Sequence, residues 1–217
     1  CLLANIAVAI EHCIKNKLGK KFCVIDWDVH HGNGTEAIFY NRNDVLTISI
    51  HQERNYPVDT GMETHQGKQE GLGYNVNLPL PAGSGHQAYL NLFDRVIDPI
   101  VSNYSPDIII VACGFDAAMI DPLSSMLCSA ETFRLLTRKA QKLADEQCNG
   151  KLALVHEGGY SEVYVPFCGH AVLEELSGSQ IIAKDPYEEL FNLRQPGSRF
   201  ENMINEVLND WEELFLK

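Results

Sequence analysis

Four apolar runs rich in β-branched residues stand out along the chain, and polar residues follow each of them directly. Short apolar runs between turn residues predict strands that are buried on both faces. The four runs cover residues 22–25, 45–51, 107–113 and 152–156. Residues 74–79 form a fifth, shorter candidate strand.

Between these runs, apolar residues recur at a spacing of three and four, which predicts helices that pack on a sheet. Gly19 is expected to end the first helix, whose apolar stripe is Leu3, Ile6, Ala7, Ile10 and Ile14. Ser129 is placed to cap a helix that runs to about residue 148, and Thr35 to cap one over residues 36–40. The other helices are predicted over residues 86–104, where Pro99 favours a kink, and near 163–176, 187–192 and 200–216.

Strands that alternate with helices predict an α/β fold with a parallel sheet flanked by helices. No internal repeat, low-complexity tract or linker divides residues 1–217, so we expect a single domain. The polar loop over residues 52–73 is long, and loops of this length in a compact domain are usually functional or disordered. Because the chain begins at Cys1, within the first predicted helix, we expect a piece of a longer protein whose N-terminal part is missing.

The composition, with 45% hydrophobic residues, is ordinary for a globular core. A net charge of −12 argues against direct binding to nucleic acid or a membrane surface and is compatible with a cationic substrate. The seven scattered cysteines include no Cys-x-x-Cys pair, which indicates reduced thiols in a cytoplasmic protein. We also find no signal peptide and no apolar run of membrane-spanning length.

Candidate chemistry begins where the first predicted strand ends. Asp26, Asp28 and His30 follow it at a spacing of two, so in an extended backbone their side chains share one face. Burying two carboxylates and an imidazole together is costly unless a cation binds them. Oxygen and imidazole ligands suit zinc, iron or manganese. The alternative is a solvated strand end that precedes a helix cap.

Two other strands present reactive residues at the same edge of the predicted sheet. Asp116 follows the strand over residues 107–113, and Tyr160 follows the strand over residues 152–156. Ligand sites in parallel sheets form outside the carboxyl ends of the strands. Asp28, His30 and Asp116 would supply three ligands and leave open positions, as in a catalytic metal site. Tyr160 could then donate to an oxyanion, and Asp26 could orient the ligands.

Simpler interpretations of these residues stay open. Asp116 could cap the turn before Asp121, and Tyr160 could be a packed aromatic residue. By default the remaining histidines have packing or hydrogen-bonding roles and two cysteines have core roles. These residues are His31, His51, His86, His156, His170, Cys113 and Cys168.

The motifs together resemble those of zinc-dependent histone deacetylases. They are Asp-x-Asp-x-His-His-Gly-Asn-Gly-Thr at 26–35, Gly-Phe-Asp-Ala at 114–117, Asp-Pro-Leu at 121–123 and Glu-Gly-Gly-Tyr at 157–160. Asn33 and the Gly-Phe-Asp form are similar to the class II branch. Residues 155–161 and 166–169 are most similar to bacterial histone deacetylase-like amidohydrolases.

The resemblance implies the arginase/deacetylase fold and hydrolysis of an N-acyl amide, typically acetylated lysine in a peptide or an acetylated polyamine. It implies Zn²⁺ on Asp28, His30 and Asp116, with Tyr160 as the oxyanion donor. It places Tyr56, Gly158 and Gly159 along the substrate tunnel, with Tyr56 where the family has Phe. It also implies two structural K⁺ sites, one near Asp26, Asp28, His30, Ser49 and Ile50, and one near Phe39, Arg42, Val45 and Tyr74.

One departure from the family affects activity. The tandem His pair that serves the family as general base and acid would lie upstream of residue 1, together with the first strands. Asp26 and Asn33 are similar to the residues that orient that pair. We therefore expect the chain alone to be inactive and to associate with another chain, as in a homo-oligomer, through the sheet edge that lacks its neighbour.

Two other functions remain as alternatives. An arginase-like ureohydrolase is suggested by Phe115, Asp116, Asp121 and Pro122, but that family needs a second metal and no Asp stands two residues beyond His30. A non-catalytic binder of acyl-lysine or acetate is the other alternative. Metal stoichiometry and turnover distinguish these functions.

Overall fold

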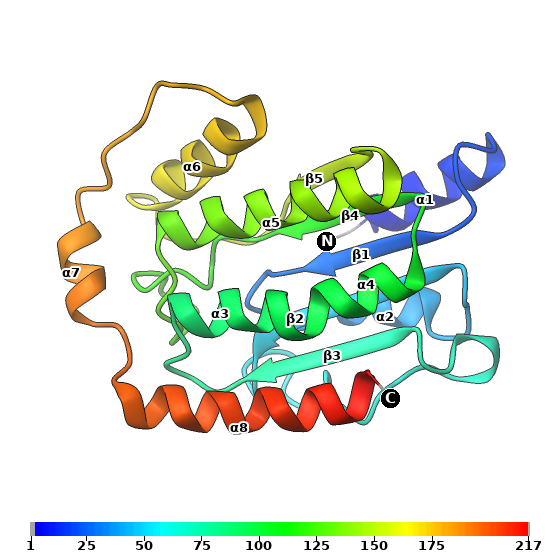
Figure 1. The fold of residues 1–217 in the computed structure, drawn as a ribbon, viewed down its shortest axis with the longest axis horizontal. Helices are drawn as coiled ribbons and strands as arrows, with labels where there is room; N and C mark the ends of the chain where they lie inside the picture. Colours follow the sequence, from blue (N-terminus) through cyan, green and yellow to red (C-terminus); the bar gives the residue numbers. More distant parts are fainter. Residues whose placement is uncertain (1–2, 217) are drawn as a thin grey trace.

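The sheet in Figure 1 consists of the five strands that the apolar runs predict. The computed structural model describes residues 3–216. The strands are β1 (Phe22–Asp26), β2 (Val45–Gln52), β3 (Asn75–Leu80), β4 (Ile108–Cys113) and β5 (Leu152–His156). All neighbouring strands are parallel, in the order β3-β2-β1-β4-β5. The predicted α/β fold with a parallel sheet is thereby confirmed.

The strand order reverses beside β1. The chain adds β2 and β3 on one side of β1 and then returns to add β4 and β5 on the other side. Asp26, the last residue of β1, lies in register with Ser49 of β2 and Ala112 of β4. Parallel sheets form ligand sites at such a reversal, beyond the carboxyl ends of the strands. The ends of β1 and β4 are therefore the place where this fold favours a site.

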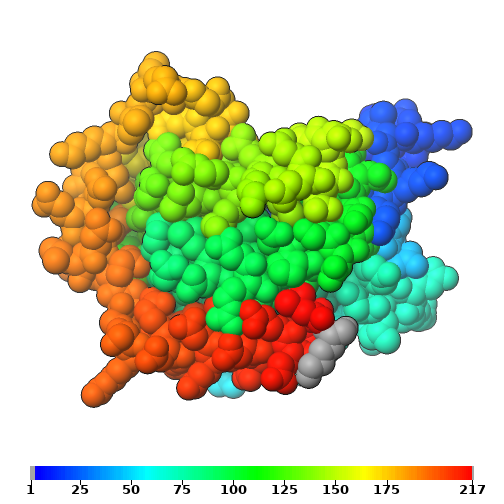
Figure 2. Space-filling model, viewed as in Figure 1, coloured from blue at the N-terminus to red at the C-terminus, as the bar shows by residue number. Residues whose placement is uncertain are grey.

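Helices cover both faces of the sheet. They are α1 (Asn5–Lys15), α2 (Asn33–Phe39), α3 (His86–Leu92), the π-helical η2 (Phe93–Ile97), α4 (Asp98–Tyr104), α5 (Ala130–Cys148), α6 (Val165–Ser177), α7 (Glu188–Leu193) and α8 (Ser198–Phe215). The side chains of α3, α4, α5 and α8 close the face that is nearer in Figure 2. Alternate residues of a strand belong to two different hydrophobic cores. Ile25 and Ile48 pack towards these helices, while Val24 packs with Ile10 of α1.

Some helix boundaries differ from the predicted ones. α1 ends at Lys15, before Gly19, and the chain then turns with Lys17 at a φ of 59°. The first residues of the predicted helix, including Cys1, lie outside the described residues. The predicted Thr35 cap is wrong, because α2 begins at Asn33 directly after Gly32 and has no side-chain cap.

The long helix before β4 is irregular earlier than predicted. Instead of a kink at Pro99, the helix widens into the π-helical η2, where the Asp98 N–H donates to the Phe93 carbonyl. Pro99 lies in the first turn of α4, where its missing N–H does no harm. The irregular turn therefore lies before Pro99 and not at Pro99 itself.

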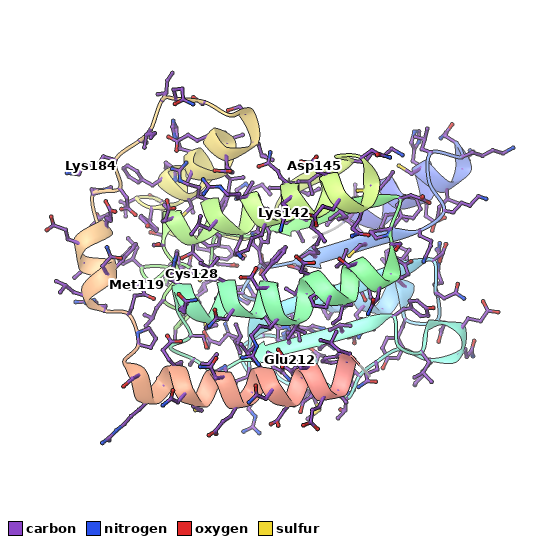
Figure 3. All side chains as sticks on the ribbon, viewed as in Figure 1. Met119, Cys128, Lys142, Asp145, Lys184 and Glu212 are labelled. Atoms are coloured by element: carbon purple, nitrogen blue, oxygen red, sulfur yellow. The ribbon has the colours of Figure 1, made fainter. Side chains whose placement is uncertain are left out.

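A helix cap and an ion pair stabilise the helices that cover the sheet. Ser129 caps α5 as predicted, since its Oγ accepts from the Thr132 N–H while Thr132 Oγ1 accepts from the Ser129 N–H at 3.0 Å. Arg95 of η2 donates from Nε to Glu212 Oε1 of α8 at 2.7 Å, which ties the last helix to this layer. Figure 3 labels Glu212 on α8. Within residues 3–216, no helix has the length and apolar character needed to span a bilayer.

β5 is one of the two edge strands of the sheet in the described part of the chain, with β3 at the opposite edge. The other four strands are almost entirely buried, whereas every residue of β5 is half-buried or exposed. Parallel strands normally have both faces covered and two neighbours. The outer edge of β5 therefore offers free backbone groups to another strand.

We predict that the 217-residue chain self-associates through β5 and binds dyes that report exposed apolar surface. Light scattering and dye fluorescence measure both properties. Ala153→Lys, which places a charge on this exposed strand position, should reduce the association. A monodisperse wild-type monomer that binds no dye would contradict the prediction.

Candidate metal centre

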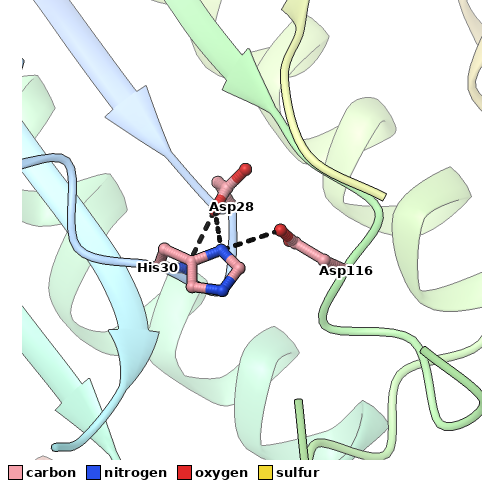
Figure 4. A group of neighbouring side chains, drawn as sticks. All are labelled: Asp28, His30 and Asp116. Atoms are coloured by element: carbon pink, nitrogen blue, oxygen red, sulfur yellow. Dashed lines mark hydrogen bonds and ion pairs between the residues drawn. The ribbon is translucent and has the colours of Figure 1, made fainter. Parts of the chain in front are cut away.

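Three potential metal ligands meet beyond the ends of β1 and β4. Asp28 and His30 follow β1, and Asp116 follows β4 (Figure 4). One ligand atom from each lies within 4.8 Å of the others. His30 Nδ1 is 3.0 Å from Asp28 Oδ1 and 3.0 Å from Asp116 Oδ2. The structure thus brings together the three residues that the sequence predicts as ligands, from segments far apart in the chain.

Backbone N–H groups hold both carboxylates in place. Asp28 Oδ2 accepts from the Gly158 N–H and Asp116 Oδ1 from the Val29 N–H, each at 2.8 Å. Asp26 Oδ1 accepts from the Asp28 N–H at 3.0 Å, so Asp26 supports the backbone of a candidate ligand. These hydrogen bonds connect the segments that follow β1, β4 and β5. None of them involves Asp116 Oδ2.

Close packing around the carboxylates requires glycine at two positions. A Cβ on Gly158 would overlap the Oδ2 atoms of both Asp28 and Asp116. A Cβ on Gly114 would overlap Asp28. Only residues without a side chain let the segments after β4 and β5 approach this closely.

The charges in the trio need a cation. Asp116 is completely buried, and its Oδ2 accepts no well-directed hydrogen bond, although His30 Nδ1 lies 3.0 Å away. Burial raises the pKa of Asp116 to about 6, with the charge of Asp28 acting in the same direction. The interactions of the His30 N–H with the carboxylate oxygens of Asp116 and Asp28 raise the pKa of His30 to about 10, against the effect of burial. Two carboxylates that share one imidazole nitrogen around a buried oxygen fit a divalent metal ion.

Two tyrosines flank the trio. The rings of Tyr56 and Tyr160 each lie edge-on to His30, with ring centroids 6.2 Å from that of the imidazole. Tyr160 is 50% exposed, so it is not the packed core residue of the simpler interpretation. Partial burial and the carboxylates of Asp116 and Asp28 raise the pKa of Tyr160, so its phenol keeps its proton at neutral pH.

Asp121 is a site residue whose role the sequence analysis missed. Its Oδ2 accepts from the Tyr160 N–H at 2.7 Å and its Oδ1 from the Leu123 N–H at 2.9 Å. Asp121 therefore holds the backbone of Tyr160 beside the metal trio. The only signal in the sequence was its place in the Asp-Pro-Leu motif.

A cavity of about 750 Å³ opens over the trio. Its wall includes most of the residues predicted for catalysis, metal binding and the substrate tunnel, namely Asp26, Asp28, His30, Asn33, Tyr56, Gly158 and Tyr160, together with His156 and Glu157. Gly159 does not line it and instead faces Phe115 and Val165. Asp116 lies beneath the cavity floor, in contact with His30.

The predicted potassium residues form two separate groups. Asp26 and Ser49 are register neighbours, and Ser49 Oγ accepts from the Gly32 N–H at 3.2 Å. In the second group, Arg42 lies over the Phe39 ring and pairs with Asp44 and Glu11. Potassium at either group stays a prediction.

The parallel sheet and this trio define an α/β protein with a metal-type site at a topological switch point. The histone deacetylase domain family matches residues 1–176. The chain belongs to the histone deacetylase family.

Similar proteins support this assignment along the whole chain. The chain is 44% identical to a histone deacetylase-like amidohydrolase of Pseudomonas aeruginosa, over 97% of this chain and 55% of that protein. It is 35% identical to a probable deacetylase of Archaeoglobus fulgidus, over 96% of this chain and 54% of that protein. The chain thus spans about half the length of these curated relatives.

Solved structures share the fold. The HDA15 HD domain has a TM-score of 0.78 and 34% identity, over 99% of this chain and 57% of that one. The histone deacetylase Clr3 has a TM-score of 0.79 and 30% identity, over 95% of this chain and 34% of that one. The expected arginase/deacetylase fold is confirmed.

We predict one transition-metal ion per chain. Asp28→Ala and Asp116→Ala should each lose bound zinc, because each removes a charged ligand. Elemental analysis after dialysis measures the stoichiometry, and Asp59→Ala in an exposed loop is the control for the loss of one carboxylate. Full zinc occupancy in both ligand variants would refute the assignment.

Proposed function

We propose that the chain is the metal-binding part of a zinc-dependent amidohydrolase that removes acetyl or related acyl groups from lysine side chains or polyamines. The observation that carries the proposal is the trio of Asp28, His30 and Asp116 beneath a cavity that Tyr160 also lines. Membership of the histone deacetylase family supports the same class of reaction.

Zn²⁺ held by Asp28, His30 and Asp116 would polarise the acyl carbonyl and lower the pKa of a water molecule to about 7. Tyr160 contributes a protonated hydroxyl that donates to the same carbonyl oxygen as negative charge develops on it. Asp121 keeps Tyr160 in place through its backbone N–H. Substrate orientation and charge stabilisation are therefore functions of this chain's own residues.

The walls of the cavity suit an acylated amine. Tyr56 and Tyr160 offer aromatic surface on either side of His30, where the methylene chain of an acyl-lysine can pack. The chain carries a net charge of −12, which favours approach of a cationic peptide or polyamine. Structural K⁺ near Ser49 and near Arg42 belongs to the same proposal.

A ureohydrolase has less support. Within residues 3–216, Asp28, His30 and Asp116 form the one group of metal-type side chains that meets the geometric requirement. Gly32 occupies the position two residues beyond His30, where a second metal would need a carboxylate. Two metal ions per chain would favour that alternative.

We predict that Tyr160→Phe lowers kcat by about 10²–10³ in an enzyme extended upstream to the full length of its relatives. The phenol contributes only as the oxyanion forms, so zinc content and KM should change little. An acetyl-lysine peptide assay measures the effect, with Tyr40→Phe as the control for the loss of a hydroxyl that does not line the cavity. An unchanged kcat would reduce Tyr160 to a packing role.

We predict little turnover by residues 1–217 alone. The sequence has no His-His pair apart from His30 and His31, and general acid–base catalysis typically contributes about 10²–10⁴. Acetyl-lysine binding without turnover in both the short and the extended protein would favour the non-catalytic binder. Full activity of the short chain would show that its own residues supply the proton transfer.

A further inference from the structure

The loop over residues 53–74 carries Tyr56 to the metal trio, yet it contains little regular structure. Its only helical part is the 3₁₀ turn η1 (Gln69–Gly71). A loop of this length keeps one shape only when side chains elsewhere bind its backbone. In this protein those side chains come from α2, β2 and β3, and they meet at Glu36.

Glu36 joins two buried amides. Its Oε2 accepts from Asn75 Nδ2 and from Asn77 Nδ2, each at 2.7 Å. Asn75 is 3% exposed and Asn77 is 1% exposed. Hydrogen bonds to an ionised acceptor are stronger than neutral ones. Glu36 is therefore a charged anchor on α2 for the two amides of β3.

Each amide uses its second hydrogen to hold the loop. Asn75 Nδ2 donates to the His65 carbonyl at 2.6 Å, and Asn77 Nδ2 donates to the Met62 carbonyl at 3.3 Å. A flipped amide would point its oxygen at the Glu36 carboxylate and at the loop carbonyl together. The carboxylate thus keeps both NH₂ groups turned towards the loop.

His31 makes a second set of contacts, with the part of the loop beside Tyr56. His31 Nδ1 donates to Thr60 Oγ1 at 2.9 Å, because the hydroxyl hydrogen of Thr60 is donated to the Pro57 carbonyl at 3.0 Å. The His31 N–H donates to the Tyr56 carbonyl at 3.1 Å. The opposite ring nitrogen of His31, Nε2, lies 3.3 Å from Glu36 Oε2.

His51 of β2 completes the cluster. Its Nε2 donates to the Gly61 carbonyl at 2.9 Å, and its ring centroid lies 4.9 Å from that of His31. Gly61 has a φ of 77°, and a Cβ there would overlap both imidazoles. The loop therefore lies directly on the two rings, and the cluster binds the loop at Tyr56, Thr60, Gly61, Met62 and His65.

Glu36 stays ionised in this environment. Burial opposes its charge, but hydrogen bonds from His31, Asn77 and Asn75 outweigh burial and lower its pKa to about 2. Its carboxylate has no direct contact with Asp28, His30 or Asp116 among the described interactions. Any effect of Glu36 on the site must therefore pass through the loop and His31.

We propose that Glu36, acting through Asn75 and Asn77, is a positioning residue that holds the 53–74 loop and thereby fixes the Tyr56 ring beside His30 at the mouth of the cavity. The proposal rests on the acyl-lysine function proposed above. Glu36 thereby affects how tightly the acyl-lysine side chain binds, whereas other contacts hold Asp28, His30 and Asp116 in place.

The variants Glu36→Ala and Glu36→Gln test the proposal. Glutamine keeps an oxygen that can accept from both amides, whereas alanine removes the anchor. Glu70→Ala, in the same loop at an exposed position, is the matched control for the loss of one carboxylate. Hydrogen exchange read by mass spectrometry should show residues 53–74 opening at least about tenfold more often in Glu36→Ala, with little change in the other two variants.

Activity provides the second readout, in the enzyme extended to full length. Glu36→Ala should raise KM for an acetyl-lysine peptide by about tenfold with kcat and zinc content nearly unchanged, and Glu36→Gln should restore most of the loss. Asn77→Ala serves as a milder variant, with faster exchange confined to the peptide around Met62.

Three results would overturn the proposal. They are unchanged exchange over residues 53–74, faster exchange spread equally over α5 and α8, and a locally opened loop with an unaltered KM. If the extended wild type hydrolysed no acyl-lysine substrate, the proposed function would fail, but the exchange pattern would still decide whether Glu36 positions the loop.

Discussion

Two buried carboxylates that face one imidazole nitrogen are the feature on which the rest of this site depends. Asp28 and Asp116 each lie 3.0 Å from His30 Nδ1. Two carboxylates this close to one atom cannot both be ionised without a proton or a metal ion between them. The surrounding backbone is arranged to keep them there. Gly158 and Val29 supply N–H groups to the carboxylates, and Gly114 and Gly158 leave the space in which the segments meet.

The parallel sheet explains why such distant residues converge. β1 and β4 are neighbours although about eighty residues of sequence separate them, and both point their carboxyl ends to the same edge. β5 extends this arrangement by one strand and delivers Gly158 and Tyr160. β5 is also the least buried strand, and its last residue, His156, lines the cavity, so the exposed strand adjoins the site.

Consecutive histidines connect the site to its supporting cluster. His30 contacts the carboxylates of the trio, while His31 contacts Thr60 and Glu36 in the cluster beneath the loop. The chain thus places a candidate metal ligand and a loop anchor on adjacent residues. Movement of the loop and movement of the ligand strand are mechanically linked through the bond from the His31 N–H to the Tyr56 carbonyl.

Local signals in the sequence determined the strands, the parallel sheet and the candidate trio. Apolar runs identify buried strands because their side chains have no access to water, and the spacing of Asp28 and His30 places both beyond one strand end. Ser129 was predictable as a cap because its partner lies three residues away. Asp116 and Tyr160 follow two other predicted strand ends at the same edge, and the family motifs imply the same roles for them.

Only the tertiary structure decided which long-range partners these residues have. Glu36 binds amides that are 39 and 41 residues away, and Asp121 binds the N–H of a residue 39 positions later. The Thr35 cap failed for a related reason, because the turn at Gly32 beside Ser49 starts α2 three residues earlier than predicted. Sequence spacing specifies contacts within one element, whereas contacts between elements depend on how the sheet brings those elements together.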